Sequence, residues 1–84
     1  PINYYANLNL SYILRIQKKY DLVEKLAKEM LTYYPIDISY LTELALSYVE
    51  RKQIKPAIEI FRDILILDPE NLTAKQYLED EHVM

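Results

Sequence analysis

The feature that most constrains this chain is a Pro-x-Asx triplet that recurs every 34 residues. The triplets are Pro1-Ile2-Asn3, Pro35-Ile36-Asp37 and Pro69-Glu70-Asn71. Proline disfavours helical backbone in the residue before it, so a helix should end ahead of each triplet. Asn or Asp two residues later can accept a hydrogen bond from the first free amides of a new helix. A fixed period near 34 is typical of stacked helix–turn–helix repeats, which bind other proteins more often than they catalyse reactions.

Apolar residues at helical spacing fill the intervals between the triplets. They predict helices over about residues 3–17, 20–33, 37–51, 54–67 and 71–81. We therefore expect one all-α domain over residues 1–84, with repeats at 1–34 and 35–68 and a half repeat at 69–84. Its architecture would be an α-solenoid of two antiparallel helical hairpins and a C-terminal capping helix.

Within these helices, the apolar stripes identify the residues that we expect to face the core. They are Leu22, Val23, Leu26, Ala27, Met30 and Leu31, then Leu41, Leu44, Ala45 and Tyr48, then Ala57, Phe61, Ile64 and Leu65, and finally Ala74, Tyr77 and Leu78.

The composition excludes several classes of site. The chain has no cysteine and no glycine, so it has neither a thiolate metal site nor a glycine-rich phosphate loop. His82 is the only histidine, and no serine has a histidine base beside it in the sequence. We expect no enzyme activity, no metal and no cofactor. No apolar run approaches the length of a membrane span, no signal peptide is visible, and nothing in the sequence indicates a compartment.

Residues 35–69 carry a pattern of large and small side chains that resembles the tetratricopeptide repeat family. It consists of Leu41, Leu44, Ala45, Tyr48, Ala57, Phe61, Ile64 and Pro69. Residues 1–35 match more loosely, through Leu10, Ser11, Leu14, Tyr20, Val23, Met30 and Pro35. Ala27 stands where the family prefers an aromatic residue, and Lys18 and Lys52 replace the glycine usual at the turn inside each hairpin. The resemblance covers essentially the whole chain.

The resemblance implies a binding surface on the concave face, which the first helix of each hairpin lines. The corresponding residues are Tyr5, Leu8, Tyr12 and Arg15, then Ser39, Thr42, Leu46 and Val49, with Thr73, Gln76 and Asp80 in the half repeat. A groove of this composition would hold an extended segment or an amphipathic helix of a partner. Glu43 would repel a terminal carboxylate, so the chaperone-tail binding of some relatives is not expected. The alternative is that these residues pack against a neighbouring repeat or a second copy.

Basic residues gather at the turn inside each hairpin, and a 34-residue period places both groups on one edge. Arg15, Lys18 and Lys19 are followed by Arg51, Lys52 and Lys55. This basic edge could dock an acidic partner, or its cations could simply complement the carboxyl ends of the helices before the turns. Nucleic acid is not an expected partner, because the net charge is −3 and the groove residues include one cation, Arg15.

The first helix is apolar on more sides than one hairpin can cover. We expect either a preceding repeat or a homodimer to cover Tyr4, Ala6 and Ile13. Because the chain begins at Pro1, at a repeat boundary, we also expect it to be a fragment of a longer protein.

These observations lead to three functional hypotheses. The first is a protein–protein interaction module that binds a peptide or helix of a partner protein in the concave groove. The second is a homo-oligomerisation module that uses the same apolar faces. The third is a non-catalytic accessory segment of a larger enzyme.

Overall fold

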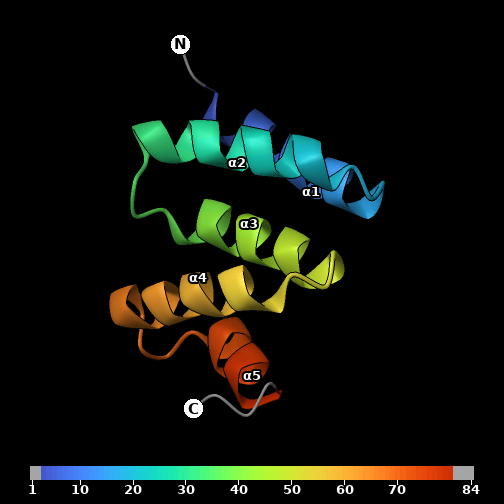
Figure 1. Ribbon diagram of the computed structural model, residues 1–84. Coiled ribbons are helices and arrows are strands. Elements are labelled where there is room, and N and C mark those ends of the chain that lie inside the picture. The colour runs from blue at the N-terminus through green and yellow to red at the C-terminus, as the bar shows by residue number, and fades with distance from the viewer. Residues whose placement is uncertain (1–2, 81–84) are drawn as a thin grey trace.

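The protein is described by a computed structural model that covers residues 3–80, which form five α-helices and no strand. The helices are α1 (Tyr4–Ile16), α2 (Tyr20–Tyr33), α3 (Ile38–Glu50), α4 (Ile54–Leu67) and α5 (Leu72–Asp80). Each packs antiparallel on the next, and α1 also contacts α3 (Figure 1). The result is a stack 39 Å long, with α1 and α2 at one end and α5 at the other.

The predicted helices agree with the observed ones to within one residue at each described end. Asn3, Asp37 and Asn71 each accept a hydrogen bond from the backbone amide three residues later, at 2.9, 3.0 and 2.9 Å. The Asx residue of each triplet is therefore the N-cap of the helix that follows, as predicted. Pro1, Ile2 and the predicted helix end at Glu81 lie outside the described residues.

The turn inside each hairpin uses a left-handed residue that is not glycine. Lys18 and Lys52 both have φ near 63°. In each turn the amide of the next residue bonds a carbonyl five positions back, Lys19 to Leu14 at 2.9 Å and Gln53 to Tyr48 at 2.8 Å. This is the Schellman pattern of helix ends, in which glycine normally occupies the left-handed position. A left-handed residue was not predicted at these turns, although both lysines stand where the resemblance expects glycine.

Buried apolar side chains lie on α2 and α3, and a core cluster lies between α3, α4 and α5. Its buried side chains are Ala45, Ala57, Phe61, Ile64, Ala74 and Leu78. Tyr77 of α5 stacks on Phe61 with ring centroids 4.9 Å apart. The predicted stripes of α3, α4 and α5 therefore face the core, and the large rings of Phe61 and Tyr77 fill the space beside small alanines.

Several residues depart from the predicted core and surface pattern, among them Leu22, Tyr4 and Tyr40. Leu22 was expected in the buried stripe of α2 but is exposed. Tyr4 was expected on the uncovered side of α1, and this was wrong. The Tyr4 ring packs edge-on against Tyr34 and Tyr40. The backbone carbonyl of Tyr4 accepts a hydrogen bond from the Tyr40 hydroxyl. Burial of Tyr40 raises the pKa of its hydroxyl to about 12. The sequence analysis did not single out Tyr40, which is fully buried.

Candidate functional site

A shallow hollow of about 380 Å³ runs between α1 and α3, and we call it the α1–α3 groove. Its lining residues come from two turns of each helix: Leu8, Asn9 and Tyr12 from α1, and Ile38, Ser39, Thr42 and Glu43 from α3. The groove follows the contact between α1 and α3, and no residue of α2 lines it. Its walls are apolar at Leu8, Tyr12 and Ile38 and can form hydrogen bonds at Asn9, Ser39 and Thr42.

Of the predicted concave-face residues, the structure brings Leu8, Tyr12, Ser39 and Thr42 together in this groove. Leu46 and Val49, two further residues of the predicted surface, do not line this hollow and are partly buried against the α3–α4–α5 core.

The predicted residues at the ends of this surface lie outside the groove. Tyr5 is exposed beside Tyr4, with ring centroids 4.9 Å apart. Thr73 and Gln76 are exposed on α5, and nothing is described of the side chain of Asp80.

Arg15 ties α1 to α3 at one end of the groove. Its Nε lies 2.9 Å from Oε1 of Glu43, and its Nη1 lies 2.6 Å from Oε2 of Glu50. Burial disfavours the charged guanidinium, but hydrogen bonds with Glu43 and Glu50 outweigh this effect and raise the pKa of Arg15. The same guanidinium lies over the Tyr12 ring, 5.5 Å from its centroid. Arg15 therefore links α1 to Glu43 of α3 and packs against the Tyr12 ring on its own helix.

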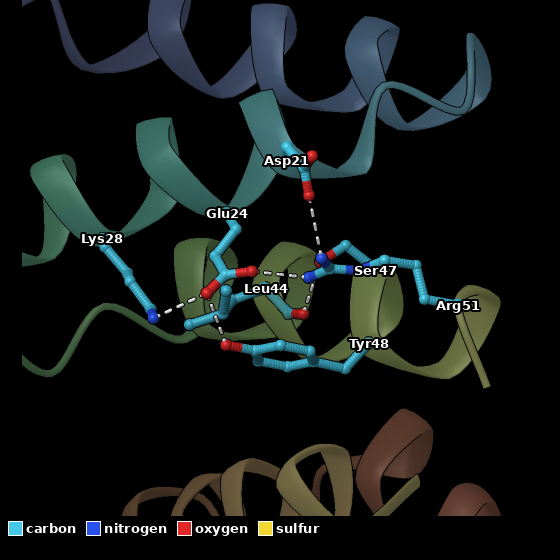
Figure 2. Close-up of polar contacts among 7 residues, drawn as sticks. All are labelled: Asp21, Glu24, Lys28, Leu44, Ser47, Tyr48 and Arg51. Carbon is cyan, nitrogen blue, oxygen red and sulfur yellow. Dashed lines mark hydrogen bonds and ion pairs between the residues drawn. The ribbon is translucent and has the colours of Figure 1, made fainter. Parts of the chain in front are cut away.

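A second arginine joins α2 to α3 on the other side of the stack. Figure 2 shows Arg51 reaching from the end of α3 to Glu24 and Asp21 of α2, with nitrogen–oxygen distances of 2.7 and 3.2 Å. Glu24 also accepts hydrogen bonds from Lys28 at 2.7 Å and from the Tyr48 hydroxyl at 2.9 Å. The hydrogen bonds from Lys28 and Arg51 are the main cause that lowers the pKa of Glu24 to about 2.

Of the predicted basic edge, the two arginines are in ion pairs with acidic residues of other helices. Lys18, Lys19, Lys52 and Lys55 are exposed, and Lys18 and Lys19 lie with Arg51 around a hollow of about 450 Å³ at the start of α2. The carboxylate of Asp21 lies in the same hollow and pairs with Arg51. Arg15 and Arg51 therefore act mainly as ties between neighbouring helices, a role that the sequence analysis had not given them.

The described residues offer no constellation that suggests catalysis. Ser11 and Ser47 are buried, and each hydroxyl donates to the carbonyl three residues earlier, of Leu8 and of Leu44. Within residues 3–80 no three acidic or imidazole side chains gather in a way that could hold a metal ion. Nor is any helix of this part of the chain long and apolar enough to cross a membrane. His82 lies outside the described residues.

Comparison with protein-family models, with curated proteins and with solved structures found no significant match for this chain. The site therefore has to be interpreted from its own geometry.

Proposed function

We propose that this chain is a protein-interaction module of tetratricopeptide type, whose α1–α3 groove binds an extended or helical segment of a partner protein. The architecture in this proposal is a short α-solenoid, in which each hairpin repeats the packing of the one before.

The repeat is supported by the burial of residues that are 34 positions apart. Ser11 of α1 and Ala45 of α3 are both fully buried. The buried set of α2, Val23, Ala27 and Met30, corresponds residue by residue to the buried set of α4, Ala57, Phe61 and Ile64. The second helices of the two hairpins thus bury equivalent positions although their side chains differ, and the first helices share one buried position, which supports a structural repeat.

The single observation that carries the functional proposal is the composition of the α1–α3 groove. Tyr12 is exposed at its edge, and apolar Leu8 and Ile38 lie beside hydrogen-bonding Asn9 and Thr42. Exposed tyrosine next to aliphatic and amide groups is typical of interface residues that contribute most to binding. The ion pairs of Arg15 fix the spacing of the two helices, so a partner would meet a preformed surface with little ordering cost.

A peptide-display selection against the wild-type chain, followed by fluorescence anisotropy with the selected peptides, tests this function. Tyr12→Ala removes the exposed ring, and Ser39→Arg places a long side chain in the groove. We expect each change to weaken peptide binding by about tenfold, which corresponds to ~1.4 kcal/mol.

Two matched controls separate the groove from the rest of the surface. Tyr33→Ala removes a tyrosine of α2 that is 56% exposed, close to the 53% of Tyr12, and Glu59→Arg adds an arginine to an exposed position of α4. Both controls should bind within about twofold of wild type, and circular dichroism should show all four variants folded. Peptides that bind the two groove variants as tightly as they bind wild type would contradict the proposal.

A further inference from the structure

The outer face of the first hairpin, which we define as the side of α1 and α2 turned away from α3, is apolar and uncovered. A comparison of side-chain exposure at positions 34 residues apart on α3 and α1 shows the missing cover. On α3, Leu44 is 6% exposed and Ser47 is fully buried. Their counterparts on α1, Leu10 and Ile13, are 44% and 49% exposed. Because α2 packs on α3 and no described helix packs on this side of α1, the outer face lacks the cover that its counterpart on α3 has.

The outer face contains a hollow of about 330 Å³ between α1 and α2. Four leucines and two charged residues line it: Leu10, Leu14, Leu22, Leu26, Lys25 and Glu29. Leu10 thus lies level with the stretch of α2 from Lys25 to Glu29. Apolar patches bordered by polar groups commonly mark protein interaction sites.

The two charged residues indicate which occupant fits this face. Lys25 and Glu29 are exposed and lie one helical turn apart, and within residues 3–80 neither side chain has an ion-pair partner. By contrast, Glu24 and Lys28 on the same helix are paired with each other. A two-fold axis that crosses α2 at right angles between Lys25 and Glu29 would exchange their positions. Lys25 of each copy would then lie opposite Glu29 of the other.

We propose that a second copy of this chain covers the outer face in a two-fold dimer, with α1 and α2 antiparallel to the same helices of the second copy. The leucines of both copies form the centre of a four-helix contact, and two Lys25–Glu29 pairs fix its register. Leu10 lies close to the axis and meets Leu10 of the other copy. This contact is separate from the proposed groove function, because Leu8 and Tyr12 lie on another side of α1.

Charge exchange tests the register directly. Sedimentation equilibrium should show a concentration-dependent dimer for wild type. Lys25→Glu and Glu29→Lys each place like charges opposite one another twice, so each should raise the dimer dissociation constant by about tenfold at low salt. The double variant Lys25→Glu/Glu29→Lys restores opposite charges and should return to the wild-type value. Lys55→Glu, a reversal at an exposed position of α4, should leave dimerisation unchanged.

Disulfide crosslinking tests the position of the axis, because the chain has no native cysteine. Under mild oxidation Leu10→Cys should crosslink to itself. A mixture of the Lys25→Cys and Glu29→Cys variants should give more crosslinked pair than either variant alone. Both results would support the proposed register.

Three results would overturn the proposal. The first is a strict monomer at millimolar concentration, which would leave the outer face to a helix of another protein. The second is equal weakening by the single and double charge variants. The third is a dimer that dissociates with Tyr12→Ala but not with Lys25→Glu, since that would place self-association in the groove. Circular dichroism of every variant should confirm that it is folded, so that a loss of dimer is not mistaken for unfolding.

Discussion

At the scale of single residues, Glu24 is the point where the polar contacts between α2 and α3 converge. It accepts from Arg51, Lys28 and Tyr48, and its side chain is 25% exposed. These partners favour the carboxylate, which explains why its pKa falls from 4.5 to about 2. Arg51 and Glu24 therefore connect the two hairpins through charge.

The low pKa of Glu24 predicts a component of stability that depends on pH. Since the pKa is lowered by folding, this component is present above pH 4.5 and is lost as the pH falls toward 2. Glu24→Gln should lower the free energy of unfolding at neutral pH by roughly 1–2 kcal/mol after solvent screening is allowed for. Urea unfolding across this pH range should show the difference from wild type disappearing near pH 2.

Glu59→Gln, which changes an exposed carboxylate of α4, is the matched control for Glu24→Gln. It should leave the pH dependence close to that of wild type. A Glu24→Gln variant whose stability runs parallel to wild type down to acidic pH would contradict the assigned role of this residue.

At the scale of helices, Asx caps mark where α1, α3 and α5 begin. The side chain of Asp37 accepts a hydrogen bond from the amide of Tyr40 at 3.0 Å. It lies at the start of α3, which contacts α1, α2 and α4. Asp37→Ala should reduce the free energy of unfolding by about 1 kcal/mol, whereas Asp37→Asn, which keeps the acceptor, should cost only a few tenths. Thermal and urea denaturation measure both. Equal losses in the two variants would show that the charge, rather than the hydrogen bond, is what matters.

The left-handed lysines predict a gain of stability. Lys52 has φ near 63°, a backbone conformation that is sterically unfavourable for a residue with a Cβ atom. Glycine has no Cβ and adopts this conformation without the steric penalty. Lys52→Gly should raise the free energy of unfolding by roughly 0.5–1 kcal/mol, part of the relief being offset by the flexibility of glycine in the unfolded chain. Lys52→Ala keeps the Cβ and should give no gain. A destabilised glycine variant would mean that the lysine side chain contributes contacts of its own.

The sequence allowed the helices to be predicted closely because their limits depend on local chemistry. The N-caps of α1, α3 and α5 are Asx residues two positions after a proline, and both features can be read from neighbouring residues. The left-handed turns could not be predicted in this way, since Lys18 and Lys52 have no intrinsic preference for positive φ. There the closed turn of the hairpin imposes the conformation against the local propensity.

At the scale of the whole molecule, the stack places similar positions of successive hairpins in similar surroundings. The resemblance to tetratricopeptide repeats implied that certain residues of the first helix of each hairpin share one surface, and Leu8, Tyr12 and Thr42 do line one groove. It did not reveal that Arg15 pairs with Glu43 and Glu50, because those carboxylates lie on another helix. Such pairs depend on the offset between helices, which a residue pattern within one helix does not contain.

Leu46 and Val49 show the same dependence on neighbouring helices. Leu46 and Val49 occupy the expected positions on α3, but the packing of α4 and α5 draws them toward the core. The partial burial of these two side chains therefore depends on the neighbouring helices, which the spacing of residues within α3 does not show.

The measurement that tests the central claim most directly is NMR mapping of a selected peptide on the isotope-labelled chain. If the α1–α3 groove is the binding site, the amide signals that shift on titration should cluster at Leu8, Asn9, Tyr12 and residues 38–43. Tyr12→Ala should weaken the binding measured in this titration by about tenfold. Shifts that cluster instead on α4 and α5, or on the outer face around Leu10 and Leu26, would contradict the claim that this groove is where the protein meets its partner.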